Sequence, residues 1–98
     1  MEQIQIKPEN LERAANMLKA MAHPVRIMII DSLEDGKEHT VTEIHRKLGI
    51  EQSVTSHHLG ILKDKGVLTS RRMGKNTYYF LKHENIRTLL VCINSCCE

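Results

Sequence analysis

Apolar residues recur at helical spacing along most of this chain and give way to a β-like segment in its second half. The first helix is predicted over residues 9–21, because Pro8 suits the first turn of a helix. Its apolar stripe consists of Leu11, Ala14, Ala15, Leu18 and Met21. His23-Pro24 interrupts the pattern and begins a second helix, which is expected to end by Gly36.

Two shorter helices are predicted in the middle of the chain. Thr40 and Glu43 have the spacing of a capping box, so a helix should begin there and end at Gly49. The next helix should run from about residue 52 to 65 and stop at Gly66. The face of this helix that is expected to pack inward carries Val54, His58, Ile61 and Leu62.

Beyond these helices the spacing changes to that of strands. The segments "VLTSRR" and "NTYYFL" are rich in β-forming residues and flank a turn at Gly74, which predicts a β-hairpin over 67–81. A last helix is predicted over 84–97. The expected fold is therefore one domain, 1–98, mostly α with a small β-hairpin, in the order α-α-α-α-β-β-α.

The segment 41–65 has the layout of a helix-turn-helix, whose second helix reads bases in the major groove of DNA. The DNA contacts predicted on that helix are Gln52, Ser53, Thr55, Ser56, His57 and Lys63. The hairpin that follows would be the wing of a winged helix-turn-helix. Its predicted DNA contacts are Arg71, Arg72 and Lys75. Its aromatic residues, Tyr78, Tyr79 and Phe80, are expected to anchor the wing to the core, with stacking on single-stranded bases as the alternative.

Charge is unevenly distributed, although the whole chain carries only +2. Residues 52–82 contain six Lys/Arg against the single Asp64, a net charge of +5. This favours double-stranded DNA as a partner, and a solvated basic face is the alternative. No apolar run is long enough to span a membrane and the chain starts without a signal peptide, so no membrane partner and a cytoplasmic location are expected.

The two terminal helices carry more apolar residues than so small a domain needs for its own core. A homodimer interface is therefore predicted at Leu11, Leu18, Ile86, Leu89, Leu90 and Ile93. The segments "LKAMAHPVRIMII" and "SVTSHHLGILKDKGVLTSRRMGKNTYYFL" also resemble the ArsR/SmtB family of bacterial winged-helix repressors over about residues 11–82. The resemblance implies a homodimer formed by the first and last helices, a palindromic DNA operator, and repression relieved by an inducer, often a metal or metalloid ion.

The family's usual metal ligands are missing from this sequence. Thr40 and Thr42 stand where its soft-metal sensors carry Cys-x-Cys, and only His83 and Glu84 represent the ligands that zinc sensors carry on the last helix. The adjacent His57 and His58 point about 100° apart on a helix and can hardly share one ion. No metal ligand and no certain cofactor are therefore assigned.

All three cysteines lie in the last helix, at Cys92, Cys96 and Cys97. A helical wheel puts Cys97 on the apolar stripe and the other two one turn apart on its edge. They are either a helix tail in which Cys97 packs as a small apolar residue, or a thiol site for a soft metalloid such as As(III) or for oxidants. A repressor without a small inducer therefore remains an alternative.

A second alternative is a winged helix that binds only protein. An enzyme is not expected, because the sequence has neither a phosphate-binding glycine loop nor a nucleophile elbow. Asp31, Glu34 and Asp35 cluster near a helix end, but no apolar surroundings are predicted that would raise a carboxyl pKa.

Overall fold

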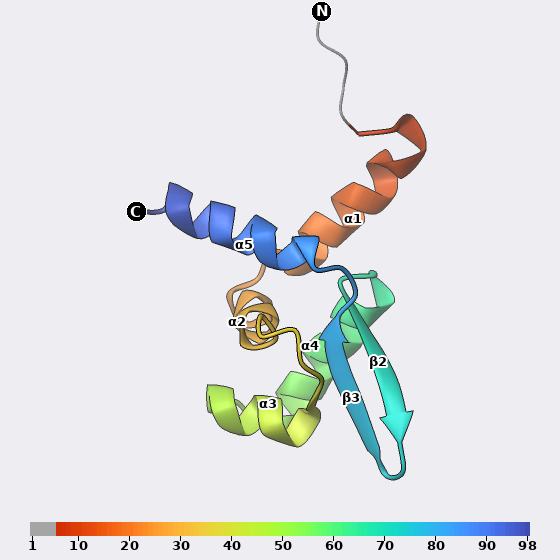
Figure 1. The fold of residues 1–98 in the computed structure, drawn as a ribbon, viewed down its shortest axis with the longest axis vertical. Coiled ribbons are helices and arrows are strands. Elements are labelled where there is room, and N and C mark those ends of the chain that lie inside the picture. The colour runs from red at the N-terminus through yellow and green to blue at the C-terminus, as the bar shows by residue number, and fades with distance from the viewer. Residues whose placement is uncertain (1–5) are drawn as a thin grey trace, which may run out of the picture.

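The computed structural model describes residues 6–98, and the predicted winged helix-turn-helix architecture is present. The helices and strands, in chain order, are the short 3-10 helix η1 (Pro8–Asn10), α1 (Leu11–Met21), α2 (Pro24–Ser32), β1 (His39–Thr40), α3 (Val41–Leu48), α4 (Gln52–Asp64), β2 (Leu68–Met73), β3 (Asn76–Leu81) and α5 (Asn85–Cys96). The β2–β3 hairpin projects away from the helices, and the terminal helices α1 and α5 lie at the end of the molecule opposite its tip (Figure 1).

Local hydrogen bonds explain where the central helices begin and end. The Thr40 hydroxyl accepts from the Glu43 backbone N–H at 3.1 Å, and the Glu43 carboxylate accepts from the Thr40 N–H at 2.8 Å. The predicted capping box is therefore present at the start of α3. Gly49 ends α3 in the left-handed conformation at φ 69°, which glycine adopts at little cost. At the start of α2, the His23 ring Nδ1 accepts from the Val25 N–H at 3.1 Å, a cap that the sequence pattern did not predict.

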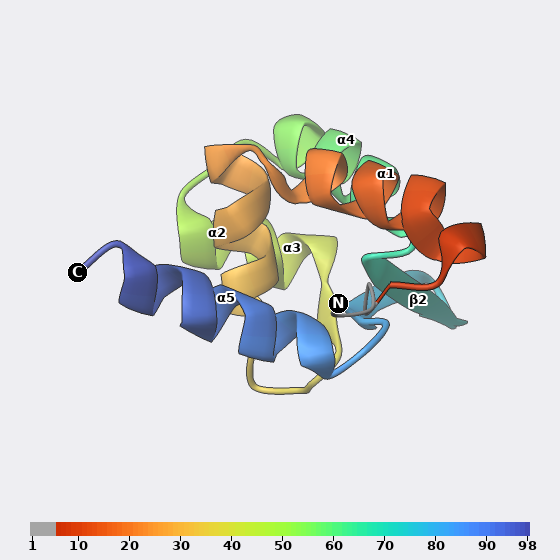
Figure 2. The same ribbon diagram turned by 90° about the horizontal axis from the view of Figure 1, so that it is seen from above.

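The core gathers residues from every helix and from the start of the wing. It consists of Ala20, Met21, Ile29, Ile30, Leu33, Ile44, Leu59, Leu62, Val67, Leu68 and Ile86. α2 contacts both α1 and α5, and the view from above shows it between these two helices (Figure 2). The prediction that Ile86 belongs to a dimer interface was wrong, because this side chain is only 6% exposed and packs in the core of its own protomer. It lies in the first turn of α5, where that helix leaves the hairpin.

The buried face of α4 is rotated from the one that the helical wheel predicted. Thr55, His58, Leu59 and Leu62 are buried, whereas Val54, expected inside, is 39% exposed. Thr55 was predicted to contact DNA, and this prediction was wrong because its side chain is fully buried. Its hydroxyl donates to the Glu51 carbonyl at 3.0 Å, which satisfies the polar group inside the helix and lets threonine pack like an apolar residue.

The wing belongs to a three-stranded antiparallel sheet in the order β1-β3-β2. The added strand, β1, pairs His39 with Tyr79 and Thr40 with Tyr78. A two-residue strand is too short to produce an alternation of apolar and polar residues, so the sequence pattern did not predict it. Because Thr40 is also the N-cap of α3, this pairing joins the wing directly to the helix-turn-helix.

His58 connects α4 to the junction between α1 and α2 through a hydrogen bond with Arg26. Its ring Nδ1 accepts from Arg26 Nε at 3.1 Å, and Arg26 Nη1 donates to the Ala20 carbonyl at 3.2 Å. The His23 ring lies 4.7 Å from the His58 ring, centroid to centroid. Burial lowers the pKa of His58 from its ordinary value of 6.5, and the charges of His23, Arg26 and His57 act in the same direction. The neutral ring with Nδ1 unprotonated is therefore the form that this contact requires.

This lowered pKa predicts that the protein loses stability in mild acid. Below pH 6.5 the unfolded chain binds a proton at His58 that the folded chain resists, so acidification favours unfolding until the folded pKa is reached. The free energy of unfolding, measured in urea from about pH 7.5 to 5.5, should fall by at most about 1.4 kcal/mol per pH unit on account of this group. His58→Gln should flatten the curve, whereas the control His83→Gln, at an exposed position, should not. Equal slopes in wild type and His58→Gln would contradict this assignment.

Candidate nucleic-acid interface

The exposed side of α4 carries polar residues in one continuous band. Gln52, Ser53, Ser56, His57 and Lys63 are all exposed, as the sequence predicted. They lie outside the buried face of the helix, so their positions are fixed by the core beneath it. The start of α4 has no side-chain cap, and its first backbone N–H groups are therefore available to an acceptor such as a phosphate oxygen.

The turn between α3 and α4 is held by two contacts that orient α4. The Ile50 N–H donates to the His45 carbonyl at 3.1 Å, and the His45 ring Nδ1 lies 3.1 Å from the Ile50 carbonyl oxygen. The His45 ring and the His45 carbonyl thus both contact Ile50, on the far side of Gly49. The left-handed conformation of Gly49 makes this tight turn possible. Sequence reasoning missed the role of His45, because a histidine on a short helix carries no signal of a contact with the following turn.

The basic residues of the wing point to opposite faces of its sheet. Arg72 pairs with Thr77, which lies two positions before Tyr79 on β3, so Arg72 and Tyr79 share one face of the sheet. Tyr79 packs against the core. Arg71 pairs with Tyr78 and therefore lies on the other face. All of these positions follow from the antiparallel register of β2 and β3. Tyr79 thus anchors the wing as expected, while Tyr78 lies on the outer face.

The two arginines also differ in their partners. Arg71 donates from Nε and Nη2 to the two carboxylate oxygens of Glu38, both at 3.0 Å. Arg72, Lys75 and Lys63 are exposed and make no ion pair within residues 6–98. Of the wing cations predicted to meet DNA, Arg72 and Lys75 therefore have their charges available, and Arg71 is already paired.

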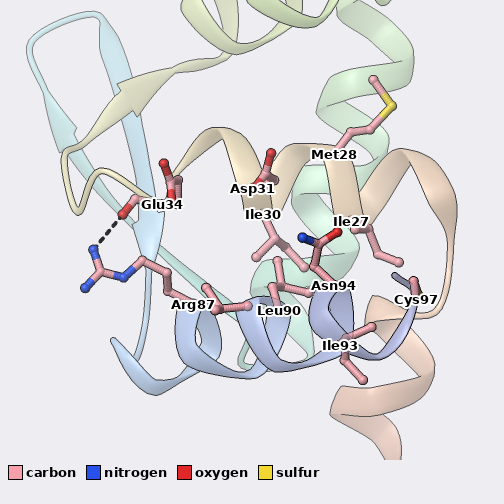
Figure 3. A pocket seen from close by; sticks show the side chains of 11 residues that line it. Ile27, Met28, Ile30, Asp31, Glu34, Arg87, Leu90, Ile93, Asn94 and Cys97 are labelled. Atoms are coloured by element: carbon pink, nitrogen blue, oxygen red, sulfur yellow. Dashed lines mark hydrogen bonds between the residues drawn. The ribbon is translucent and has the colours of Figure 1, made fainter.

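At the opposite end of the molecule, α2 and α5 border an apolar groove of about 570 Å³. Arg87 lies at one end, where its Nη1 donates to the Glu34 carbonyl at 3.0 Å, and Cys97 lies at the other (Figure 3). Cys92 and Cys96 are exposed as well but do not line the groove.

Residues 6–98 bring no group of three or more His, Cys, Asp or Glu side chains together in a way that fits a metal ion. Across the described part of the chain, no helix has the length and apolar character needed to cross a membrane.

Comparisons with known proteins agree with this geometry. Residues 23–70, which include α2, α3 and α4, match the family model described as bacterial regulatory protein, arsR family. The HTH-type transcriptional regulator YgaV of Escherichia coli is 32% identical over 84 residues, which cover 86% of this chain and 85% of YgaV. The transcriptional repressor PagR of Bacillus anthracis is 35% identical over 85 residues, covering 87% of this chain and 85% of PagR.

Solved structures extend the agreement to the three-dimensional fold. The crystal structure of PagR superposes with a TM-score of 0.80 at 33% identity, covering 89% of this chain and 99% of PagR. The homodimeric winged helix-turn-helix DNA-binding domain Mb0332 of Mycobacterium bovis superposes with a TM-score of 0.81 at 29% identity, covering 97% of this chain and 87% of that domain. The chain therefore belongs to the arsR family of bacterial regulatory proteins, as a DNA-binding transcriptional repressor with a winged helix-turn-helix fold.

Proposed function

We propose that this repressor binds a palindromic operator as a homodimer, with α4 in the major groove and the wing on the neighbouring backbone. The observation that carries the proposal is the exposed polar band of α4, which lies outside its buried face. The helix also has no side-chain cap at its start. Gln52, Ser53, Ser56 and His57 contact base edges, and Lys63, Arg72 and Lys75 contact phosphates. The two half-sites are about one helical turn of DNA apart.

The terminal helices supply the dimer interface. Leu11 and Leu18 on α1 and Leu89 and Ile93 on α5 are between 37% and 55% exposed, although they are large and apolar. Leu90 is partly buried against the core and lines the α2–α5 groove. Exposed apolar side chains of this size on the two terminal helices of a small domain are typical of a subunit contact. The homodimeric state of the similar Mb0332 domain supports the same arrangement.

The thiols of α5 are the proposed site of regulation. Cys92, Cys96 and Cys97 are all exposed, and Cys97 lies at the groove beside Ile93, a residue of the proposed interface. A soft metalloid such as As(III), or an oxidant, reacts with thiolates at this position and changes the spacing of the two recognition helices.

Replacing Arg72 by Ala should weaken DNA binding regardless of sequence. Loss of one phosphate contact should flatten the slope of log K against log salt by about 0.9. Fluorescence anisotropy with DNA from the protein's own promoter measures both quantities. Arg13→Ala, which removes the same charge from an exposed position on α1, serves as the control and should leave the slope unchanged. The same slope for wild type and Arg72→Ala would show that Arg72 does not touch phosphate.

Placing a carboxylate in the apolar contact of the terminal helices should separate the dimer. Light scattering at micromolar concentration should give twice the chain mass for the wild type and a monomer mass for Ile93→Asp, because an unpaired buried charge costs several kcal/mol. Met73→Asp changes an equally exposed apolar residue of the wing and should remain a dimer. A monomeric wild type would contradict the proposed interface.

Arsenite or mild oxidant should lower operator affinity through the thiols alone. The wild-type protein should lose affinity on addition of either reagent, and the variant with Cys92, Cys96 and Cys97 all changed to Ser should bind DNA normally and not respond. Operator affinity of the wild type and of the triple variant is measured by fluorescence anisotropy, with and without reductant. If neither reagent changes wild-type affinity, the cysteines are only a helix tail and the inducer, if there is one, acts elsewhere.

A further inference from the structure

Glu38 and Arg71 form a two-pronged ion pair across the outer face of the wing sheet. Arg71 Nε donates to Glu38 Oε1 and Arg71 Nη2 to Glu38 Oε2, both at 3.0 Å. Arg71 lies on β2 and Glu38 directly precedes β1, so β3 runs between them. The pair therefore joins the two outer strands of the sheet. Such a fork-to-fork arrangement is the geometry in which a guanidinium also binds phosphate.

The loop that carries Glu38 is ordered independently of Arg71. Asp35 Oδ1 accepts from the Lys37 N–H at 2.8 Å, and its Oδ2 lies 2.9 Å from His39 Nε2. Immediately after Glu38, the chain enters β1 and is paired with β3. Because its backbone is fixed on both sides, Glu38 needs little further ordering to hold a guanidinium.

Arg71 is exposed enough to reach a DNA phosphate when Glu38 does not hold it. The Arg71 side chain is 57% exposed and that of Glu38 34%. Both charges are partly solvated, so water and salt screen the attraction between them. A phosphate oxygen would offer Arg71 a similar bond, so the carboxylate decides whether this cation is available to DNA. Arg72 has no such competitor within residues 6–98.

We propose that Glu38 is an affinity-limiting residue that occupies Arg71 in place of a DNA phosphate and leaves Arg72 and Lys75 as the wing's phosphate contacts. Glu38 thus acts through Arg71 and lowers the attraction of the wing for DNA of any sequence. This inference rests on the proposed contact between the wing and DNA. It differs from the sequence-based expectation that Arg71 contacts DNA together with Arg72 and Lys75.

Removing the carboxylate charge tests the proposal. Glu38→Gln should release Arg71, strengthen DNA binding about threefold to tenfold at low salt, and steepen the slope of log K against log salt by about 0.9. Arg71→Ala should leave the wild-type slope unchanged. The double variant Glu38→Gln/Arg71→Ala should return to the wild-type slope, because the gain requires the released guanidinium. Binding of each variant to the wild-type protein's own promoter DNA and to an unrelated duplex is measured by fluorescence anisotropy. Circular dichroism verifies that each variant is folded.

Glu34→Gln is the matched control for the change in net charge. Its exposed side chain makes no ion pair within residues 6–98. Its backbone carbonyl accepts from Arg87 and its backbone N–H donates to the Asp31 carbonyl, and neither bond involves the side chain that is changed. A flatter slope for Arg71→Ala would show that Arg71 leaves Glu38 for DNA in the wild type and would overturn the proposal. An unchanged slope for Glu38→Gln, or a gain that Glu34→Gln or the double variant reproduces, would overturn it too. If the wild-type protein binds neither the promoter DNA nor the unrelated duplex, the proposed function itself is refuted.

Discussion

Burial of one face of α4 determines which of its side chains can reach a DNA groove. Thr55, His58, Leu59 and Leu62 recur at i, i+3, i+4 and i+7 and are all buried, so the opposite side of the helix is exposed as a single band. Two of the four are polar, and both are satisfied inside the protomer. In this rotational position of the helix, neither buried polar side chain is left without a partner.

The sequence pattern predicted the elements better than it predicted which face of a helix is buried. The capping box at Thr40 and the stop at Gly49 depend on local chemistry, and both lie where the sequence indicated. The rotation of α4 depends on tertiary contacts. Thr55 is a polar residue type common on surfaces, but its hydroxyl bonds to the preceding turn and its side chain is buried. Ile86 is an apolar residue of a terminal helix, but α5 begins on the core and Ile86 packs there. Residue type alone cannot separate these cases.

The wing illustrates a second limit of sequence reasoning. Neighbouring residues of a strand point to opposite faces, so Arg71 and Arg72 have equal charge but different surroundings. The sequence does supply this alternation. It does not supply the partner, because Glu38 lies 33 positions away from Arg71 in the chain and reaches it only through the short strand β1. Basic residues in a predicted wing are therefore equivalent in charge, and the fold decides which of them is paired with a carboxylate.

The proposed regulation and DNA reading occur at opposite ends of the molecule, and α2 connects them. α2 contacts α5 along the apolar groove and also contacts α3 and α4. Ile27 lines the groove, and its neighbour Arg26 donates to His58 of the recognition helix. A displacement of α5 therefore has a contiguous route of packed and hydrogen-bonded groups to α4. Such a route changes DNA affinity only when the two positions of α5 favour different positions of α4, because a ligand shifts an equilibrium only by its difference in affinity for the two states.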